Sequence, residues 1–311
     1  MFKLARPFYM LVETPLHAGS GNDLGIIDLP IQRERHTGFP KVESSSLKGC
    51  IRKAFEELKN QHGEIKAQTI SLVFGPEKGD AHAGALGFTD ARLLLFPVKS
   101  VRGVFAWLTC PRILNRMVND LKLAGIKKLP EVPEESTVPK GCQLIVKDDL
   151  VVLEEYTFKV KKADSDSAPC NVMAKWLSDN VLPGSSEFNY WREKMRKDII
   201  VLPDDDFCDF ANLSTEVITR TKINYTTGTV QPSALFTEEY LPVETVLYSL
   251  ALTTPIFVEK PTEKGIFGQA KVSEEQAVMD YWSAGMPGVI QLGGNATIGK
   301  GLIRIRIMGV D

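Results

Sequence analysis

Strand-like and helix-like hydrophobic patterns follow one another in a fixed order along this 311-residue chain. Strand patterns occur at residues 8–14, 86–96, 101–108 and 302–308. Helical spacing begins near Ser45, where apolar residues recur at Leu47, Ile51 and Phe55. A further helix is predicted to open at Ser273 and to close before Gly285. The order strand, helix, two strands, helix, strand fits an α+β fold better than a doubly wound sheet. We therefore expect a ferredoxin-like or RNA-recognition-type core that carries long insertions.

The segments between these patterns are less regular. A helix is predicted at residues 111–123, where a proline suits the first turn, and shorter helices at 172–181 and 187–197. The sequence PDDDFCD at residues 203–209 predicts an acidic turn. Ser273 and the residues after it, SEEQ, fit a capping box at the start of the last helix.

Charge is distributed unevenly, although the formal net charge is only -2. Residues 92–128 hold eight lysines and arginines against one acid, whereas residues 198–216 hold six acids and no base. A localised basic surface suits an anionic ligand. We expect the acidic segment to face a further copy of the chain. Near-neutrality therefore excludes only a uniformly basic surface of the kind that coats DNA.

Cysteine and histidine usage argues against a soft-metal site. The five cysteines form no CxxC pair and the four histidines are scattered, so neither a zinc knuckle nor a disulfide framework is indicated. Free thiols are typical of a reducing cytoplasm, and any metal is expected to be a hard, oxygen-ligated cation. No apolar run approaches the roughly 18 residues of a membrane span, so no membrane partner is expected.

The densest polar stretch is HAGSGNDLGIIDLPIQRERH at residues 17–36. Asp28 stands in an apolar setting within it and is a candidate functional carboxylate, and His17 begins the same stretch. Ordinary roles are also open to both residues. An aspartate before a proline-containing turn commonly satisfies local backbone donors, and a loop histidine commonly anchors its loop.

Three further clusters suit contact with an anion. Ser45, Ser46 and Lys48 at the helix start offer hydroxyls and a positive charge to a phosphate, although the serines could equally cap the helix. The loop LGGNATIGKG at residues 292–301 allows close approach of a ligand to the backbone, or simply makes a turn. Residues 217–236 predict a hairpin around NYTTG whose arms carry bases without acids. Such a hairpin suits nucleic acid, and an ordinary edge hairpin is the alternative.

The order of these motifs resembles one protein family. The blocks IDLPIQRERHTGFP, SSSLKG, TRTKINYTTGTV and LGGNATIGKG lie in a matching region that runs from residue 8 to residue 306. Together they are similar to the repeated backbone subunits of type III-B CRISPR effectors, the Cmr complexes, within the RAMP superfamily. The resemblance implies one RAMP domain with an RRM-like palm at about residues 1–110 and 241–311. It also implies helical insertions at about residues 111–216 and a protruding β-hairpin thumb at about 217–236.

The resemblance further implies a function. Copies of the chain would stack into a filament on a CRISPR guide RNA, with other Cmr subunits, and cleave complementary single-stranded target RNA at regular intervals. Asp28 matches the aspartate that the family requires for cutting, and His17 matches a histidine of the same loop. Glu238, Glu239 and Tyr240 match a block that the family places on the active-site side of a neighbouring subunit, so a catalytic role is implied for them as well. Contacts with RNA are implied for a larger set: Ser45, Ser46, Lys48, Arg52, Arg220, Lys222, Gly293, Gly294 and Lys300.

A divalent cation, Mg²⁺ or Mn²⁺, held by Asp28 is the expected cofactor, although the same carboxylate could instead orient a ribose 2′-OH as a base. Two other interpretations of the chain stay open. One is a non-catalytic scaffold that binds guide RNA, and the other is a RAMP endonuclease that processes precursor guide RNA. Asp28 separates the first of these from a target nuclease, because a scaffold needs no acid at that position.

Overall fold

The computed structural model describes residues 2–22, 25–62, 67–77, 79 and 82–310. Eleven strands within these residues form one mixed sheet: β1 (Leu4–Val12), β2 (Lys41–Val42), β3 (Leu86–Phe88), β4 (Ala91–Lys99), β5 (Phe105–Thr109), β6 (Thr137–Val138), β9 (Lys161–Lys162), β10 (Ile199–Val201), β13 (Val246–Thr253), β14 (Val289–Gln291) and β15 (Leu302–Ile307). Their order is β14-β15-β1-β13-β4-β5-β10-β6-β9, with β2 added to β4 and β3 added to β13. Two separate hairpins, β7 (Leu150–Leu153) with β8 (Tyr156–Lys159) and β11 (Glu216–Ile223) with β12 (Val230–Tyr240), complete the strands.

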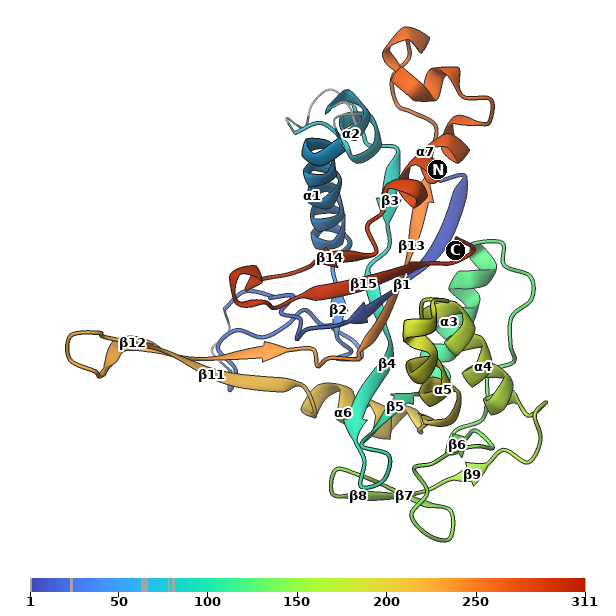
Figure 1. Ribbon diagram of the computed structural model, residues 1–311, viewed down its shortest axis with the longest axis vertical. Helices are drawn as coiled ribbons and strands as arrows, with labels where there is room; N and C mark the ends of the chain where they lie inside the picture. The colour runs from blue at the N-terminus through green and yellow to red at the C-terminus, as the bar shows by residue number, and fades with distance from the viewer. Residues whose placement is uncertain (1, 23–24, 63–66, 78, 80–81, 311) are drawn as a thin grey trace.

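Seven α-helices occur in the described residues: α1 (Ser44–His62), α2 (Ala67–Phe74), α3 (Pro111–Leu123), α4 (Pro169–Val181), α5 (Asn189–Lys197), α6 (Asp204–Leu213) and α7 (Glu274–Gly285). Short 3₁₀ turns are η1 (Ser186–Phe188), η2 (Pro261–Glu263), η3 (Gly265–Gln269) and η4 (Ala296–Ile298). The mixture of one large sheet with helices confirms the predicted α+β class (Figure 1). Within the described residues, a helix with the length and apolar content needed to cross a membrane is absent.

β1 lies inside the sheet and is buried on both faces. It pairs antiparallel with β13 on one side and with β15 on the other. Phe8 packs edge-to-face against Trp282 of α7, with ring centroids 5.3 Å apart. On the opposite face Tyr9 pairs across the strands with Tyr248, whose hydroxyl donates to Asp120 of α3 at 2.8 Å. Because α7 and α3 cover different faces, the sheet forms the central layer of the core.

Helix starts show where local patterns suffice and where they do not. Ser273 Oγ accepts from the backbone N–H of Gln276 at 3.3 Å, which confirms the predicted cap of α7. At α1 neither Ser45 nor Ser46, the serines offered as caps, caps the helix. The backbone N–H of Ser44 donates to Asp90 Oδ1 at 2.9 Å, and the two serines that follow lie inside the first turn. A carboxylate distant in sequence therefore satisfies the start of α1.

The predicted acidic turn at residues 203–209 is wrong, because this segment begins α6. Pro203 precedes the helix, and three aspartates fill its first turn, where negative charge interacts favourably with the helix dipole. Phe207 and Phe210 of this helix are buried. Composition at the helix start resembles turn composition, and the apolar face is only a few residues long.

The acidic segment that follows α5 does not form one exposed surface. Asp198 is buried and accepts from Lys194 Nζ at 2.8 Å and from the backbone N–H of Gln143 at 3.1 Å. Its charge is compensated inside the chain. The expectation that residues 198–216 face another copy therefore cannot include Asp198.

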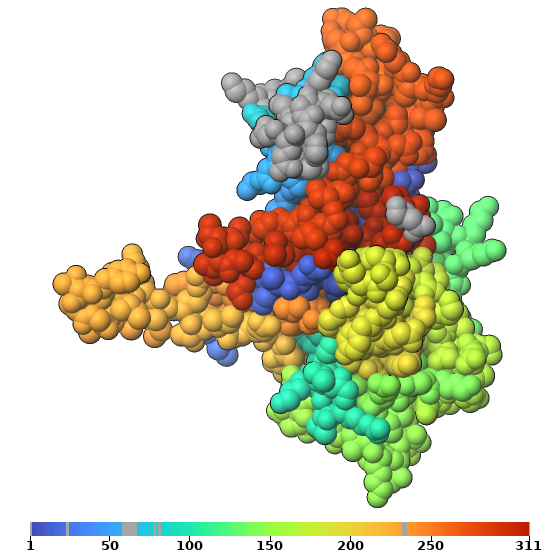
Figure 2. Space-filling model, in the orientation of Figure 1, coloured from blue at the N-terminus to red at the C-terminus, as the bar shows by residue number. Residues whose placement is uncertain are grey.

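β11 and β12 form an antiparallel hairpin that projects from the body as an arm (Figures 1 and 2). The loop at its tip closes through Asn224, whose backbone N–H donates to the Thr229 carbonyl at 2.8 Å and whose Oδ1 accepts from the Thr226 N–H at 2.9 Å. Gly228 there has φ of 68°, the left-handed conformation that favours glycine. Tyr225 at the tip is fully exposed.

Candidate active site

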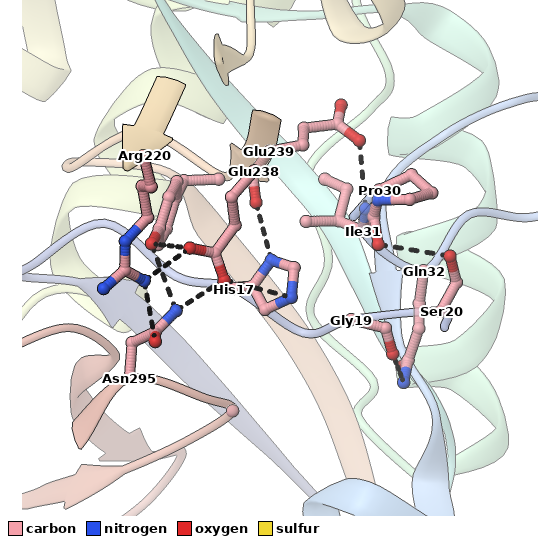
Figure 3. A network of polar contacts seen from close by, with 12 residues as sticks. His17, Gly19, Ser20, Pro30, Ile31, Gln32, Arg220, Glu238, Glu239 and Asn295 are labelled. Carbon is pink, nitrogen blue, oxygen red and sulfur yellow. Dashed lines mark hydrogen bonds and ion pairs between the residues drawn. The ribbon is translucent and has the colours of Figure 1, made fainter. Parts of the chain in front are cut away.

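Polar residues from distant parts of the chain meet at the base of the hairpin (Figure 3). β12 ends with the sequence TEEY at residues 237–240, the loop after β1 carries His17, and the loop before β15 carries Asn295. Side chains alternate along a strand. Glu238 therefore points toward His17 and Asn295, while Glu239 points to the opposite face.

Glu238 is buried among hydrogen-bond donors. Its Oε2 accepts from the Tyr240 hydroxyl at 2.6 Å and from the Arg220 guanidinium at 2.8 Å, and its Oε1 accepts from the Asn295 amide at 2.6 Å. Burial raises the pKa of this carboxyl, but the three donors outweigh that effect and hold the pKa of Glu238 below its ordinary value. Burial and the adjacent carboxylate raise the pKa of Tyr240 to about 12, so its hydroxyl stays protonated and donates.

His17 joins the same cluster and is nearly buried. Its Nδ1 lies 2.8 Å from the Glu239 carbonyl oxygen. Because a carbonyl oxygen only accepts, Nδ1 carries a proton, and Nε2 then faces Glu238 Oε1 at 3.5 Å. Two glycines make room for this residue. A Cβ at Gly19 would lie 2.7 Å from His17 Nε2, and one at Gly293 would lie 2.3 Å from the His17 carbonyl oxygen.

Glu239 is separated from this cluster and anchors a loop. Its Oε2 accepts from the backbone N–H of Ile31 at 3.0 Å. Its Oε1 accepts from Arg33 at 2.5 Å and from the Thr215 hydroxyl at 2.7 Å. With both oxygens engaged and the side chain buried, Glu239 holds the segment after Asp28 against β12.

Asp28 is exposed and lies on the free edge of β12. Its Oδ2 accepts from the Thr237 backbone N–H at 2.7 Å and from the Thr237 hydroxyl at 2.9 Å. These two donors, the backbone N–H first, lower the pKa of Asp28 below its ordinary value. Leu29, the next residue, forms a parallel bridge with Glu238. Asp28 is therefore an ionised carboxylate on the surface. It lies next to the buried Glu238 cluster, because the residue that follows it in sequence pairs with Glu238.

The residues predicted to contact a phosphate, Ser45, Ser46 and Lys48, lie in the first turns of α1. Ser45 is exposed, and Gln32 donates to Ser46 Oγ at 3.5 Å. Burial, with the nearby Arg52 charge, lowers the pKa of Lys48. Arg52 itself donates to Glu56 at 2.8 Å and to the Gly75 carbonyl at 2.7 Å, contacts that belong to the fold.

Of the other residues predicted to contact RNA, Lys300, Gly294 and Arg220 lie at the cluster around Glu238 and His17, whereas Lys222 does not. Lys300 Nζ lies 4.9 Å from the Tyr240 ring centroid, a cation–π contact that joins it to the Glu238 cluster. The Gly294 N–H donates to the His17 carbonyl at 2.9 Å, so the glycine loop packs on the same residue. Arg220 is engaged by Glu238, whereas Lys222 lies exposed farther out on β11.

Three residues of the site escaped sequence reasoning: Thr237, Asn295 and Gln32. Asn295, at φ of 64°, donates to both Glu238 and the Tyr240 hydroxyl. Gln32 accepts from the Glu43 N–H at 2.7 Å and donates to the Gly19 carbonyl at 3.1 Å, which ties the His17 loop to the start of α1. Asn295 and Gln32 each lie inside a block already singled out, at residues 292–301 and 17–36, so position in a polar motif was the only available signal for them.

No group of three or more His, Cys, Asp or Glu residues arranged to hold a metal occurs within the described ranges. The Glu238 oxygens face protein donors. Asp28 can contribute one carboxylate. Because Mg²⁺ is commonly held by one or two carboxylates together with substrate phosphates and water, Asp28 fits the role of a single protein ligand.

A family model of the RAMP superfamily matches residues 10–304. The chain belongs to the RAMP superfamily. This RAMP protein is 36% identical over 302 residues, 96% of its length and 93% of the relative's, to the CRISPR system Cmr endoribonuclease Cmr4 of Pyrococcus furiosus. Its structure is similar to the crystal structure of oligomeric Cmr4 from Pyrococcus furiosus, with a TM-score of 0.70, 31% identity and 98% of each chain covered. A chain of the type III-B Cmr-beta complex bound to cognate target RNA shares the fold, with a TM-score of 0.70 at 21% identity and 98% coverage of both chains. Within the superfamily, the chain belongs with the Cmr4 proteins of CRISPR Cmr systems.

Proposed function

We propose that this chain is a guide-RNA-binding backbone subunit of a type III-B Cmr complex and that it cleaves complementary target RNA. The observation that carries the proposal is Asp28, an exposed carboxylate that Thr237 holds in its ionised form at the base of a projecting hairpin. A group that meets a phosphodiester from outside needs that exposure and that charge. The relative of 36% identity, named an endoribonuclease, supports the same conclusion.

The proposal includes a ferredoxin-like palm and a thumb. Strands β15, β1, β13 and β4 are antiparallel neighbours, α1 lies between β1 and β4 in sequence, and α7 lies between β13 and β15. This arrangement supports a βαββαβ palm built from residues 1–110 and 241–311, with the insertions at 111–216. The thumb would be the β11–β12 hairpin, whose strands extend a few residues beyond 217–236.

Guide RNA would run past the start of α1 toward the thumb. A side chain at Gly49 of α1 would meet no atom of the described chain within 4 Å, so a phosphate backbone can approach there beside the exposed Ser45. On the thumb, Lys222 and Tyr225 are exposed, and a tyrosine ring suits stacking on a base. Recognition of this kind reads RNA shape and leaves sequence choice to base pairing.

Copies stacked along the guide in the cytoplasm, together with other Cmr subunits, would repeat the Asp28 site at regular intervals. Cleavage of RNA beside its own 2′-OH needs that hydroxyl in line with the leaving oxygen, and a nucleotide flipped by the thumb provides that geometry. Asp28 can accept the hydroxyl proton. A divalent cation bound at Asp28, Mg²⁺ or Mn²⁺, would supply charge stabilisation at the phosphate.

The buried cluster has a supporting role in this proposal. Glu238 joins β11, β12 and the glycine loop through Arg220, Tyr240 and Asn295, and it thereby fixes the base of the thumb under Asp28. Direct participation of His17, Glu238, Glu239 or Tyr240 in the reaction stays a prediction.

Asp28→Asn in a reconstituted complex tests the nuclease function. Target cleavage should be lost while RNA binding and assembly persist, because the substitution keeps the shape of the side chain and removes its charge. Asp164→Asn, at an exposed aspartate of another loop, is the matched control and should cleave normally. EDTA should stop cleavage by the wild type, and Mg²⁺ or Mn²⁺ should restore it.

Cleavage at the wild-type rate by Asp28→Asn would refute the nuclease function and leave the scaffold interpretation. Cleavage of repeat RNA by the isolated protein would favour processing of precursor guide RNA instead. An unchanged rate in EDTA would refute the metal at Asp28 and leave the carboxylate as a base.

A further inference from the structure

Thr237 makes three hydrogen bonds with Asp28. Its backbone N–H and its hydroxyl both donate to Asp28 Oδ2, at 2.7 and 2.9 Å. The same hydroxyl accepts from the Asp28 backbone N–H at 3.0 Å. A hydroxyl can donate and accept hydrogen bonds at once. Both the backbone and the carboxylate of Asp28 are therefore held by one side chain that lies 209 residues away in sequence.

Further hydrogen bonds join the segment after Asp28 to β12. The Leu29 N–H donates to the Thr237 carbonyl at 3.0 Å, and the Glu239 N–H donates to the Leu29 carbonyl at 3.0 Å. The Ile31 N–H then reaches the Glu239 carboxylate at 3.0 Å. The Asp28 loop thus adds a third, partial strand to the edge of β12 that β11 leaves open.

We propose that Thr237 is a positioning residue for RNA cleavage. Through Thr237, the orientation of the Asp28 carboxylate depends on the position of β12, the second strand of the thumb. The inference rests on the proposed function and adds a regulation to it. β12 is one continuous strand from Val230 near the tip to Tyr240 at the base. A duplex that displaces the thumb displaces Thr237 with it, and Asp28 moves by the same hydrogen bonds.

This linkage has a physical consequence for where cutting occurs. A reacting group misplaced by about 1 Å can lose about 10²-fold in rate. The backbone after Asp28 is held by β12, but within the described residues the Asp28 carboxylate itself is bonded to Thr237, so its alignment depends on Thr237. Cleavage is then coupled to a seated thumb, and a target that does not engage the thumb is bound without being cut.

The test compares two substitutions of Thr237 with one of Thr219 in the reconstituted complex. Thr237→Val keeps the shape and the backbone N–H but removes the hydroxyl, and Thr237→Ser keeps the hydroxyl. Thr219→Val is the matched control, because Thr219 lies directly opposite Thr237 on β11 and is exposed. Single-turnover cleavage of target RNA, RNA affinity and the dependence of the rate on pH are measured for each.

Thr237→Val should cleave roughly 10- to 100-fold more slowly, as expected for a misaligned reacting group, with unchanged RNA affinity. The acid limb of its pH profile should move to higher pH, because Asp28 loses one of the donors that favour its ionised form. Thr237→Ser should restore both the rate and the profile, and Thr219→Val should match the wild type.

Asp28→Asn separates the two levels of the argument. If it is inactive while Thr237→Val keeps the wild-type rate and profile, the positioning role is overturned and the nuclease function stands. If Asp28→Asn is active, both fall. If Thr237→Val fails to assemble, Thr237→Ala replaces it, and a wild-type rate for that variant equally overturns the inference.

Discussion

The contact between Gly293 and His17 allows a sharp prediction about the glycine loop. Gly293 has φ of 76°, and a Cβ there would lie 2.3 Å from the His17 carbonyl oxygen. No side chain tolerates that distance, so Gly293→Ala must move the loop. The neighbouring Gly294 N–H would then lose its 2.9 Å hydrogen bond to the same carbonyl.

The magnitude follows from two contributions. A left-handed conformation costs about 1–2 kcal/mol for a residue other than glycine. A buried carbonyl that loses its donor costs about 1–3 kcal/mol more. Gly293→Ala should therefore lower the free energy of unfolding by about 2–5 kcal/mol, the sum of these terms. It should also slow cleavage, because the loop carries Asn295, which bonds to Glu238.

Gly299→Ala is the matched control for this variant. Gly299 has the same φ of 76°, but a Cβ there meets no atom within 4 Å in the described chain. It should lose only the conformational part, about 1–2 kcal/mol. Urea unfolding of both variants and the wild type gives the comparison. Equal losses for the two glycines would refute the argument, since the close approach to His17 would then contribute nothing.

Two further predictions concern buried charges. In Glu238→Gln the free energy of unfolding should depend less on pH than in the wild type. The pKa of Glu238 in the folded protein lies below its ordinary 4.5, so the ionised carboxylate stabilises the wild type above that pH. The wild type loses this contribution as the pH falls through the folded pKa. Urea unfolding above and below pH 4.5 measures the difference, and parallel curves for the two proteins would contradict it. Lys194 Nζ lies 2.8 Å from the buried Asp198 carboxylate. Lys194→Met should lower the free energy of unfolding by about 3–5 kcal/mol, because it leaves Asp198 buried without its charged partner. Lys175→Met breaks an exposed pair of the same i,i+4 spacing and should change stability by less than about 1 kcal/mol, so similar losses for both lysines would show that burial is irrelevant here.

Local sequence patterns were informative wherever one element satisfies its own requirements. The alternation in LIRIRIM predicts β15, and Ile303, Ile305 and Ile307 of that strand are buried. The serine cap of α7 and the hairpin around NYTTG were predicted for the same reason. In each case the hydrogen bonds or the apolar face lie within a few residues, so neighbouring letters carry the information.

The acidic start of α6 and the cap of α1 show the opposite situation. Turn-like composition concealed a helix whose short apolar face becomes evident only when it packs on the core. At α1 the required acceptor came from Asp90, 46 residues away, and the nearby serines were not used. A sequence window does not contain the partner in either case.

The candidate site shows the same division most clearly. The polar stretch at residues 17–36 singled out Asp28 and His17, and the family resemblance added residues 238–240. The match to the RAMP superfamily confirms the assignment of the chain. That Thr237 holds Asp28, that Glu238 and Glu239 serve opposite faces, and that Asn295 closes the cluster emerged only from the fold. These contacts depend on the order and register of strands brought together by burial of the whole sheet, and such long-range pairing leaves no signature in the spacing of residues along the chain.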